Sequence, residues 1–378
     1  MSLSAYVHIP FCTHKCEFCD FAAFAGLSHL EDEYCQIVCR EIEQRDASSS
    51  AQRKLDSVFY GGGTPGLIEV SNLSLIHSQL TEKFGTSVDC EINLETTPHA
   101  ITPEKVKGWR EIGVNRLSIG VESFQDDELK AIGRDHTRAQ AYDGISAALE
   151  NGLDNISLDF MYGLPTQTVD SWKDTLHQLF ELADRHPQIC HFSSYSLHLA
   201  NNSPLYSKFP KDSPQYPEDK SHEEMFLLLV QMAKEAGFQH YEVSNFCKPN
   251  HQSRHNLSYW NNSDYLAYGV SAHRYLGGVR SSNWRSIGVY MKDFLGDETS
   301  ETIDTETRMR EAIMLGLRLR SGLDLNNFEH DFGINLREKF KRQIERLLDG
   351  GFVEIVNERL RITDRGVLVS NSIISELF

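Results

Sequence analysis

The stretch YVHIPFCTHKCEFCDF, residues 6–21, places three cysteines within eight residues, directly after a short run with strand character. The three are Cys12, Cys16 and Cys19, in the spacing CxxxCxxC. A zinc site normally has four Cys or His ligands, so zinc would need a fourth ligand such as His8 or His14. A 4Fe-4S cluster can instead take three thiolates and keep its fourth iron open for another ligand. The spacing favours such a cluster, and zinc, redox thiols or purely structural thiols are the alternatives.

Short strand-like runs recur along the first half of the chain, each followed by a segment with helical periodicity. This alternation predicts an α/β fold in which helices cover a parallel sheet, and six such units indicate a barrel-like or an open (β/α) sheet. In such folds the chemistry lies at the C-terminal ends of the strands. The predicted strands are 5–10, 56–63, 90–96, 115–123, 155–163 and 191–199, and the predicted helices are 31–45, 70–83, 103–112, 138–151 and 170–185.

Three domains are predicted from the changes in pattern along the chain. Residues 1–200 form the barrel core, and residues 201–304, which lack a regular period, form a linking and ligand-binding region packed on it. Residues 305–378 contain two amphipathic helices, 308–319 and 335–349, followed by a strand pair with a polar turn around Asn357. Two helices followed by a small wing predict a winged-helix-like C-terminal domain.

Composition and charge narrow the possible partners and the compartment. The 378 residues carry a formal net charge of −17, which disfavours nucleic acid as a partner. The segment from residue 305 onward has twelve basic and twelve acidic residues, so it lacks electrostatic reach for DNA. We expect no integral membrane segment and no export signal, and therefore a cytoplasmic protein with reduced thiols. We expect a structural role for the scattered cysteines Cys35, Cys39, Cys90, Cys190 and Cys247.

Polar residues and glycines follow several of the predicted strands. The glycine-rich segment GGGTP, residues 61–65, does not match a phosphate-binding loop, but its bare backbone can approach a ligand closely. Taken singly, GGGTP is also compatible with a simple turn, and the charged residues are also compatible with surface salt bridges. These charged residues are Glu95 in NLETTP, Glu122 in GVESF, Arg134 in GRDH and Asp159 in SLDFMYGLP.

CxxxCxxC directly after a strand resembles the signature of radical S-adenosylmethionine (SAM) enzymes, which have a partial (β/α) barrel. In that family the amine and carboxylate of SAM chelate the open iron, and an electron from the cluster cleaves the sulfonium to a 5′-deoxyadenosyl radical. The resemblance implies that Phe18 packs beside the adenine and that GGGTP holds the SAM amino group.

The wider pattern resembles the oxygen-independent coproporphyrinogen III oxidases and their relatives, over essentially the whole chain. In order along the sequence, their motifs are YxHIPFCxxxCxxC, GGGTP, GVQ, and an Asp followed by YGLP. The resemblance implies SAM contacts from Tyr6, Gly62, Gly63, Thr64, Glu95, Arg134 and Asp159. Glu122 stands where those relatives have Gln, so its SAM contact is a departure from the pattern.

Two departures favour the HemW-type heme chaperones over the oxidases. The third cluster cysteine is followed by Asp20 and Phe21, whereas the oxidases have another Cys two residues after it. The oxidases also carry an N-terminal segment before the cluster strand, and about five residues precede that strand here. In addition, RHNLSYW, residues 254–260, matches the HNxxYW signature that resembles the heme-binding element of those chaperones.

The resemblance implies a heme site formed by His255, Asn256, Tyr259 and Trp260, because an imidazole can ligate heme iron and aromatic rings can pack on a porphyrin. His273 in GVSAHRY is the competing axial ligand. The expected function is a heme carrier that retains a SAM-coordinated cluster and passes heme to an acceptor, such as a respiratory heme protein, with an electron donor such as flavodoxin. The alternatives are a coproporphyrinogen III dehydrogenase and a zinc-stabilised binding protein.

Overall fold

The computed structural model describes residues 3–45, 53–201 and 203–378. Within them, six parallel strands form the centre of a twelve-stranded sheet, in the order β1-β4-β5-β6-β7-β8. All six predicted strands are confirmed, with ends shifted by a few residues. Their bounds are Ser4–Ile9 (β1), Leu55–Gly62 (β4), Thr86–Thr96 (β5), Arg116–Glu122 (β6), Ile156–Tyr162 (β7) and Ile189–Ser196 (β8).

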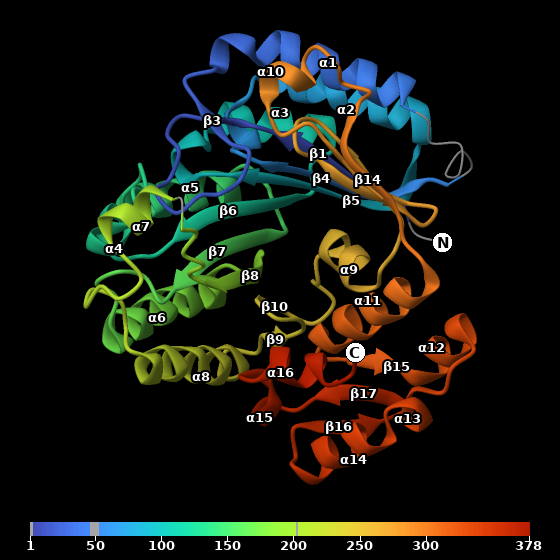
Figure 1. Ribbon diagram of the computed structural model, residues 1–378. Helices are drawn as coiled ribbons and strands as arrows, with labels where there is room; N and C mark the ends of the chain where they lie inside the picture. The colour runs from blue at the N-terminus through green and yellow to red at the C-terminus, as the bar shows by residue number, and fades with distance from the viewer. Residues whose placement is uncertain (1–2, 46–52, 202) are drawn as a thin grey trace.

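Helices cover the outer face of this sheet (Figure 1). Two of them, α5 and α6, begin with a capping box. The side chain of the capping threonine accepts a hydrogen bond from the main-chain N–H three residues later, and that residue's side chain accepts one from the threonine N–H. The five predicted helices are confirmed as α1 (Glu31–Gln44), α2 (Val70–Phe84), α3 (Pro103–Ile112), α5 (Arg138–Glu150) and α6 (Val169–Arg185). Shorter elements add α4 (Asp126–Ala131) and the 3-10 turns Ser28–Leu30, Pro65–Leu67 and Pro98–Ala100.

Side chains alternate in polarity along the central strands. In β7, Leu158 and Phe160 belong to the apolar core shared with the outer helices, while Ser157 and Asp159 point to the opposite, concave face. In β5, Leu94 belongs to the same core, and Glu95 lines a cavity on the concave face. Sheets covered on both faces normally consist of nearly continuous apolar strands, so this alternation marks a polar barrel interior.

Both edges of the sheet are extended by strands that the sequence pattern did not predict. β11 (Tyr265–Tyr268) lies parallel to β1, and β12 (His273–Leu276), β13 (Val279–Asn283) and β14 (Asp297–Thr302) follow antiparallel. At the other edge, β10 (Asn245–Cys247) and β9 (Gln239–His240) continue from β8. The helices of this region are α7 (Pro204–Lys208), α8 (Asp219–Glu235), α9 (Arg254–Trp260) and α10 (Ile287–Tyr290).

The C-terminal segment forms a small α+β unit with its own hydrophobic cluster, below the barrel in Figure 1. The predicted helix 335–349 is divided at Phe340, and the predicted strand pair turns at Asn357 and Glu358, which both have positive φ. The elements are α11 (Thr305–Arg318), β15 (Leu323–Asp324), α12 (Leu325–Phe332), α13 (Leu336–Lys339), α14 (Lys341–Asp349), β16 (Val353–Val356), β17 (Arg359–Ile362), α15 (Asp364–Val367) and α16 (Ser370–Ser375). The fold is therefore the expected α/β barrel with a small C-terminal domain.

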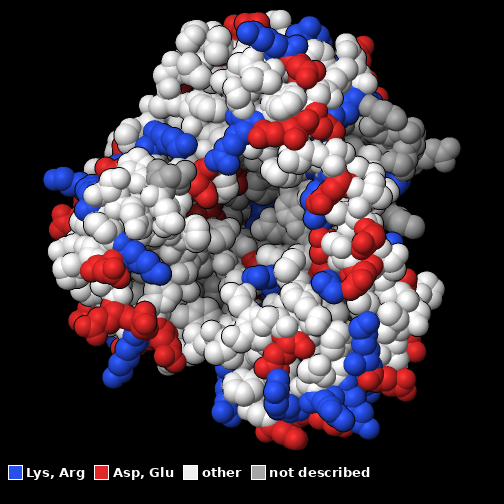
Figure 2. Space-filling view, viewed as in Figure 1, with Lys and Arg blue, Asp and Glu red and all other residues white. Residues whose placement is uncertain are grey.

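Charged residues of both signs are interspersed over the face shown in Figure 2, and this face is hollowed at its centre. Among the helices of the described ranges, none combines the length and the hydropathy needed to cross a bilayer.

One fully buried carboxylate fastens the edge strands to α1. Glu41 accepts hydrogen bonds from the Gly269 main chain (2.9 Å), the Asn283 side chain (2.8 Å) and the Tyr290 hydroxyl (2.7 Å). Arg45, one turn later, supplies its counter-charge at 2.8 Å. A buried carboxylate with this many donors positions every segment that contacts it.

We expect Glu41→Ala to lower the free energy of unfolding by about 3–5 kcal/mol, because it leaves the buried donors of Gly269, Asn283 and Tyr290 without their acceptor and removes one of the two carboxylates that contact Arg45. Urea unfolding of the cluster-free protein, followed by circular dichroism, measures the change. Glu43→Ala, an exposed position of the same helix, should change it by less than about 0.5 kcal/mol. Equal effects of the two substitutions would contradict this role for Glu41.

Candidate functional site

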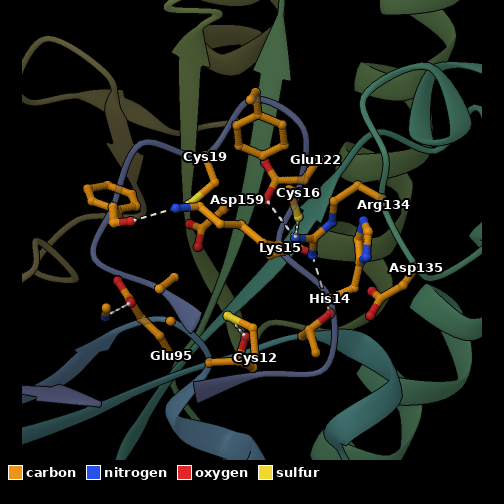
Figure 3. A pocket seen from close by; sticks show the side chains of 18 of the residues that line it. Cys12, His14, Lys15, Cys16, Cys19, Glu95, Glu122, Arg134, Asp135 and Asp159 are labelled. Atoms are coloured by element: carbon orange, nitrogen blue, oxygen red, sulfur yellow. Dashed lines mark hydrogen bonds and ion pairs between the residues drawn. The ribbon is translucent and has the colours of Figure 1, made fainter. Parts of the chain in front are cut away.

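A cavity of about 410 Å³ lies at the C-terminal ends of the parallel strands. Figure 3 shows the three thiols around it, with Glu95 on one side and Arg134 with Asp135 on the other. The structure brings most of the sequence-predicted residues together here. Those that line the cavity are Cys12, Cys16, Phe18, Cys19, Gly62, Gly63, Thr64, Glu95, Glu122, Arg134 and Asp159.

The thiols lie on a loop that runs from β2 (Phe11–Cys12) to β3 (Phe24–Ala25), two short parallel strands. The loop has little regular structure of its own, so other parts of the chain hold it in place. Asp135 accepts from the Thr13 hydroxyl (2.7 Å), the Leu205 main chain donates to Glu17 (2.9 Å), and Arg285 donates to the Asp20 carbonyl (2.7 Å). Three distant segments thus define the position of the loop.

The three thiols are free and half-buried. Burial raises the pKa of Cys12 to about 11 and also raises the pKa values of Cys16 and Cys19, so iron binding must displace their protons. Among the described residues, no group of three or more His, Cys, Asp or Glu side chains is placed to hold one metal ion. The thiolate ligands of a cubane need not converge on one metal ion, because each binds a different iron. The thiols therefore fit a 4Fe-4S cluster.

The glycine-rich segment GGGTP packs tightly against the strand that precedes the loop. A Cβ on Gly63 would lie 2.7 Å from the Pro10 main chain, and one on Gly62 would lie 2.6 Å from the His8 ring. Gly62 also has a φ of +115° and donates its N–H to Glu95 at 3.1 Å. Any residue larger than glycine would clash at these two positions, so the glycine main chain itself forms this part of the cavity wall.

Five carboxyl groups, one guanidinium and one ammonium group line this cavity, and the two cations belong to Arg134 and Lys15. Burial raises the pKa of Glu95 to about 8, and the nearby Asp159 carboxylate adds to the shift. Burial also raises the pKa of Glu122 to about 7, against the opposing effect of Arg134, and raises the pKa of Asp159. The carboxyl groups outnumber the two cationic side chains, so the cavity suits a positively charged ligand. SAM, with its sulfonium and ammonium groups, is such a ligand.

Arg134 connects the carboxyl groups to the thiols. Its guanidinium donates to the Cys16 sulfur (3.3 Å) and to the Gly120 carbonyl (2.5 Å), and it forms an ion pair with Glu122 at 3.8 Å. Its Nε is buried and has no partner in the described structure. Glu122 has a φ of +66°, a strained conformation for this residue type. The substitution of Gln by Glu thus places a carboxylate beside this arginine.

Several residues that line the cavity were not identified from the sequence. Tyr195, Ser196 and His198 lie at or just after the end of β8, and His99 forms an ion pair with Asp135 at 3.5 Å. The C-terminal ends of the predicted strands are the signal that would have found the first three. Tyr6, in contrast, is absent from this cavity and lines a second one.

The HNxxYW element forms helix α9, which Ser253 caps through a hydrogen bond from the Asn256 N–H. The His255 ring is buried, with Nδ1 at 3.0 Å from the Ser57 hydroxyl and Nε2 at 2.8 Å from the Tyr259 hydroxyl. Asn256 and Trp260 are partly buried and line neither cavity.

The second cavity, also about 410 Å³, lies beside β1, β11 and β12. It brings Tyr259 of the HNxxYW element together with His273, the other histidine considered as a ligand. Asp20 and Phe21, which follow the third cluster cysteine, line both cavities. The residues that line the second cavity are Tyr6, His8, Asp20, Phe21, Ala22, Tyr259, Tyr265, Ser271, His273 and Arg285.

Comparison with known proteins agrees with this arrangement. Residues 6–179 match the radical SAM superfamily, and residues 303–369 match the HemN C-terminal domain. The chain is 30% identical to heme chaperone HemW of Lactococcus lactis, over 98% of this chain and 96% of that protein. It is 33% identical to heme chaperone HemW of Bacillus subtilis, over 98% and 97%.

Among solved structures, the fold resembles that of the coproporphyrinogen III oxidase HemN from Escherichia coli, a radical SAM enzyme. The TM-score is 0.86 at 24% identity, over 100% of this chain and 90% of that one. Because the sequence matches extend along nearly the entire chain and the thiols, glycines and carboxyls form one cavity, the chain belongs to the HemW family within the radical SAM superfamily.

Proposed function

We propose that this protein is a heme chaperone, which binds heme and passes it to an acceptor heme protein while retaining a SAM-coordinated 4Fe-4S cluster. The observation that carries the proposal is the similarity along nearly the whole chain to proteins named heme chaperone HemW. The geometry supports it, because a thiol-lined cavity and a second cavity beside the HNxxYW helix lie on either side of one loop.

The first cavity would hold the cluster through Cys12, Cys16 and Cys19. Gly62, Gly63 and Thr64 would hold the amino end of SAM, Phe18 would pack beside its adenine, and Glu95, Glu122, Arg134 and Asp159 would complete the pocket. When bound, the cluster and SAM supply one-electron radical chemistry, with a donor such as flavodoxin as the electron source. The protein's own contribution is to bind, to orient and to exclude water.

The HNxxYW element would contribute to the heme site through the paired side chains of His255 and Tyr259. Their hydrogen bond fixes the Tyr259 ring, which packs edge-on against Tyr265 with a centroid separation of 4.7 Å. Aromatic rings held in this way can pack against a porphyrin.

Loss of any one cluster thiol should abolish cluster retention. We expect the wild type to hold about four iron and four sulfide per chain after anaerobic reconstitution, and Cys16→Ala to hold almost none. Iron and sulfide analysis with absorption spectroscopy measures this. The matched control is Cys39→Ala, a buried cysteine of α1, which should keep the full content. One zinc per chain in place of iron would overturn the cluster assignment.

SAM affinity should rise with pH, because a cationic ligand favours the ionised carboxylate and the raised pKa of Glu95 keeps its carboxyl protonated below about pH 8. We expect a rise of up to about tenfold per unit between about pH 6 and pH 8, and then a plateau. Glu95→Gln should flatten the upper part of this profile, and the remaining slope reflects Glu122. Isothermal titration of the reconstituted protein with SAM at a series of pH values measures this profile.

The exposed carboxylate Glu111 of α3 provides the control for the pH experiment. Glu111→Gln should reproduce the wild-type pH profile. An unchanged profile for Glu95→Gln would show that another group responds to the ligand charge.

Hemin titration tests the chaperone function directly. We expect the wild type to bind hemin with a Soret shift, and His255→Ala to bind about tenfold more weakly, because the Tyr259 hydroxyl loses its partner. His29→Ala, at an exposed histidine, should bind like the wild type. A thermal melt establishes that each variant is folded.

The same preparation, assayed anaerobically with coproporphyrinogen III, SAM and reduced flavodoxin, distinguishes the enzyme alternative. Absence of hemin binding together with formation of the vinyl product would replace the chaperone proposal by the dehydrogenase.

A further inference from the structure

Three histidines lie in or beside the second cavity, and they differ in the hydrogen bonds that their rings make. The His8 ring has Nδ1 at 3.1 Å from the Tyr6 hydroxyl and Nε2 at 3.0 Å from the Ala22 carbonyl. The His255 ring likewise engages both nitrogens and is only 1% exposed. Neither ring can ligate a metal without breaking a hydrogen bond and leaving its partner unpaired, which is unfavourable in a buried environment.

His273 has none of these restraints. It lies at the start of β12, is exposed to solvent and lines the cavity. Within the described residues, no hydrogen bond or ion pair reaches its ring. Its main chain is fixed by pairing with Ser282 of β13, so the ring is presented from a rigid strand.

Building on the proposed heme chaperone function, we propose that the second cavity is the heme site and that His273 is its axial ligand. Tyr259 and Tyr265 form an aromatic wall, and Arg285 is positioned to meet a propionate. His255 is then a positioning residue, which acts on the heme through Tyr259.

Arg285 suits the propionate because its guanidinium is exposed and, among the described residues, makes one hydrogen bond, to the Asp20 carbonyl. A guanidinium has five N–H donors, so donors remain for a carboxylate. The same hydrogen bond fastens the loop that follows Cys19. A carboxylate bound at Arg285 would therefore touch the loop that separates the two cavities.

The cavity has the volume of an ordinary small-molecule site and opens to solvent, so a tetrapyrrole bound here would lie partly outside it. Its volume of about 410 Å³ lies within the range of about 300–1,000 Å³ that is usual for small-molecule sites, and the exposed residues Asp20, Phe21, His273 and Arg285 mark its mouth. Glycines and cluster thiols do not line it, so heme here would leave the SAM pocket free. Heme and SAM should therefore bind together.

The test is a hemin titration of the reconstituted full-length protein, with and without saturating SAM. We expect His273→Ala to weaken hemin binding by about tenfold or more and to change the position of the Soret band, because the axial ligand is lost. Added imidazole should restore the wild-type band in His273→Ala. In His255→Ala, which keeps the ligand, the band of the bound fraction should stay at the wild-type position.

His330→Ala serves as the matched control, since His330 is an exposed histidine of the C-terminal domain. It should bind like the wild type. Arg285→Gln should weaken hemin binding about threefold to tenfold and should have a smaller effect on heme dimethyl ester, which lacks the propionate charge.

The outcomes separate this inference from the proposed function. If the wild type binds no hemin, the proposed function fails. If the wild type binds hemin while His273→Ala keeps its affinity and band position, the axial assignment is overturned and the chaperone function stands. Competition between SAM and hemin, or imidazole rescue of His255→Ala instead of His273→Ala, would also overturn the placement.

Discussion

Every polar side chain on the concave face of the barrel needs a hydrogen-bond partner, and the arrangement of both cavities depends on this constraint. Many of the partners form a series of side-chain and main-chain hydrogen bonds across the barrel interior, because an unpaired buried group is costly. It runs from Asp159 through Ser157 to His191 (2.8 Å), to Tyr241 (2.9 Å), to Ser253 (3.3 Å) and to Glu91 (3.4 Å), and then through His255 to Tyr259. A series of residues linked by hydrogen bonds therefore runs from the thiol-lined cavity to the HNxxYW helix.

This network explains why α9 lies where it does. The Glu91 carboxylate accepts from main-chain N–H groups at the N-terminus of α9, at 3.2 Å from Arg254 and 3.3 Å from His255. A carboxylate at this end of a helix is favourable, since the first N–H groups have no partner within the helix. The helix is therefore anchored inside the barrel by β5, the strand that also carries Glu95. A shift of β5 would therefore move residues that line both cavities, Glu95 directly and Tyr259 through α9.

The sequence predicted those parts of the fold whose pattern is local and periodic. The parallel strands and their helices were found because an apolar face recurs along each element, and the strand-end rule placed Glu95 and Asp159 in one cavity. The strands β9 to β14 were not predicted. Most of them are short, and β11 and β10 pair with strands far away in the sequence, β1 and β8. By contrast, β12 and β13 form a local hairpin at Gly277 and Gly278, whose turn signal was not recognised. Likewise, β11 is a strand because β1 offers an unpaired edge, which no local pattern around Tyr265 reveals.

The HNxxYW element shows most clearly how little a motif alone predicts about the position of its side chains. Residues i and i+4 of a helix share a face, so contact between His255 and Tyr259 follows from their spacing. The packing of the helix determines which of the two side chains lines the cavity. That packing depends on Ser57 and Glu91, which lie 198 and 164 residues before His255. The His255 ring lies on the interior side of the helix and forms a hydrogen bond with Ser57 of the barrel, while Tyr259 lines the second cavity. A motif specifies residue types, and the long-range partners then decide which residue lines the cavity.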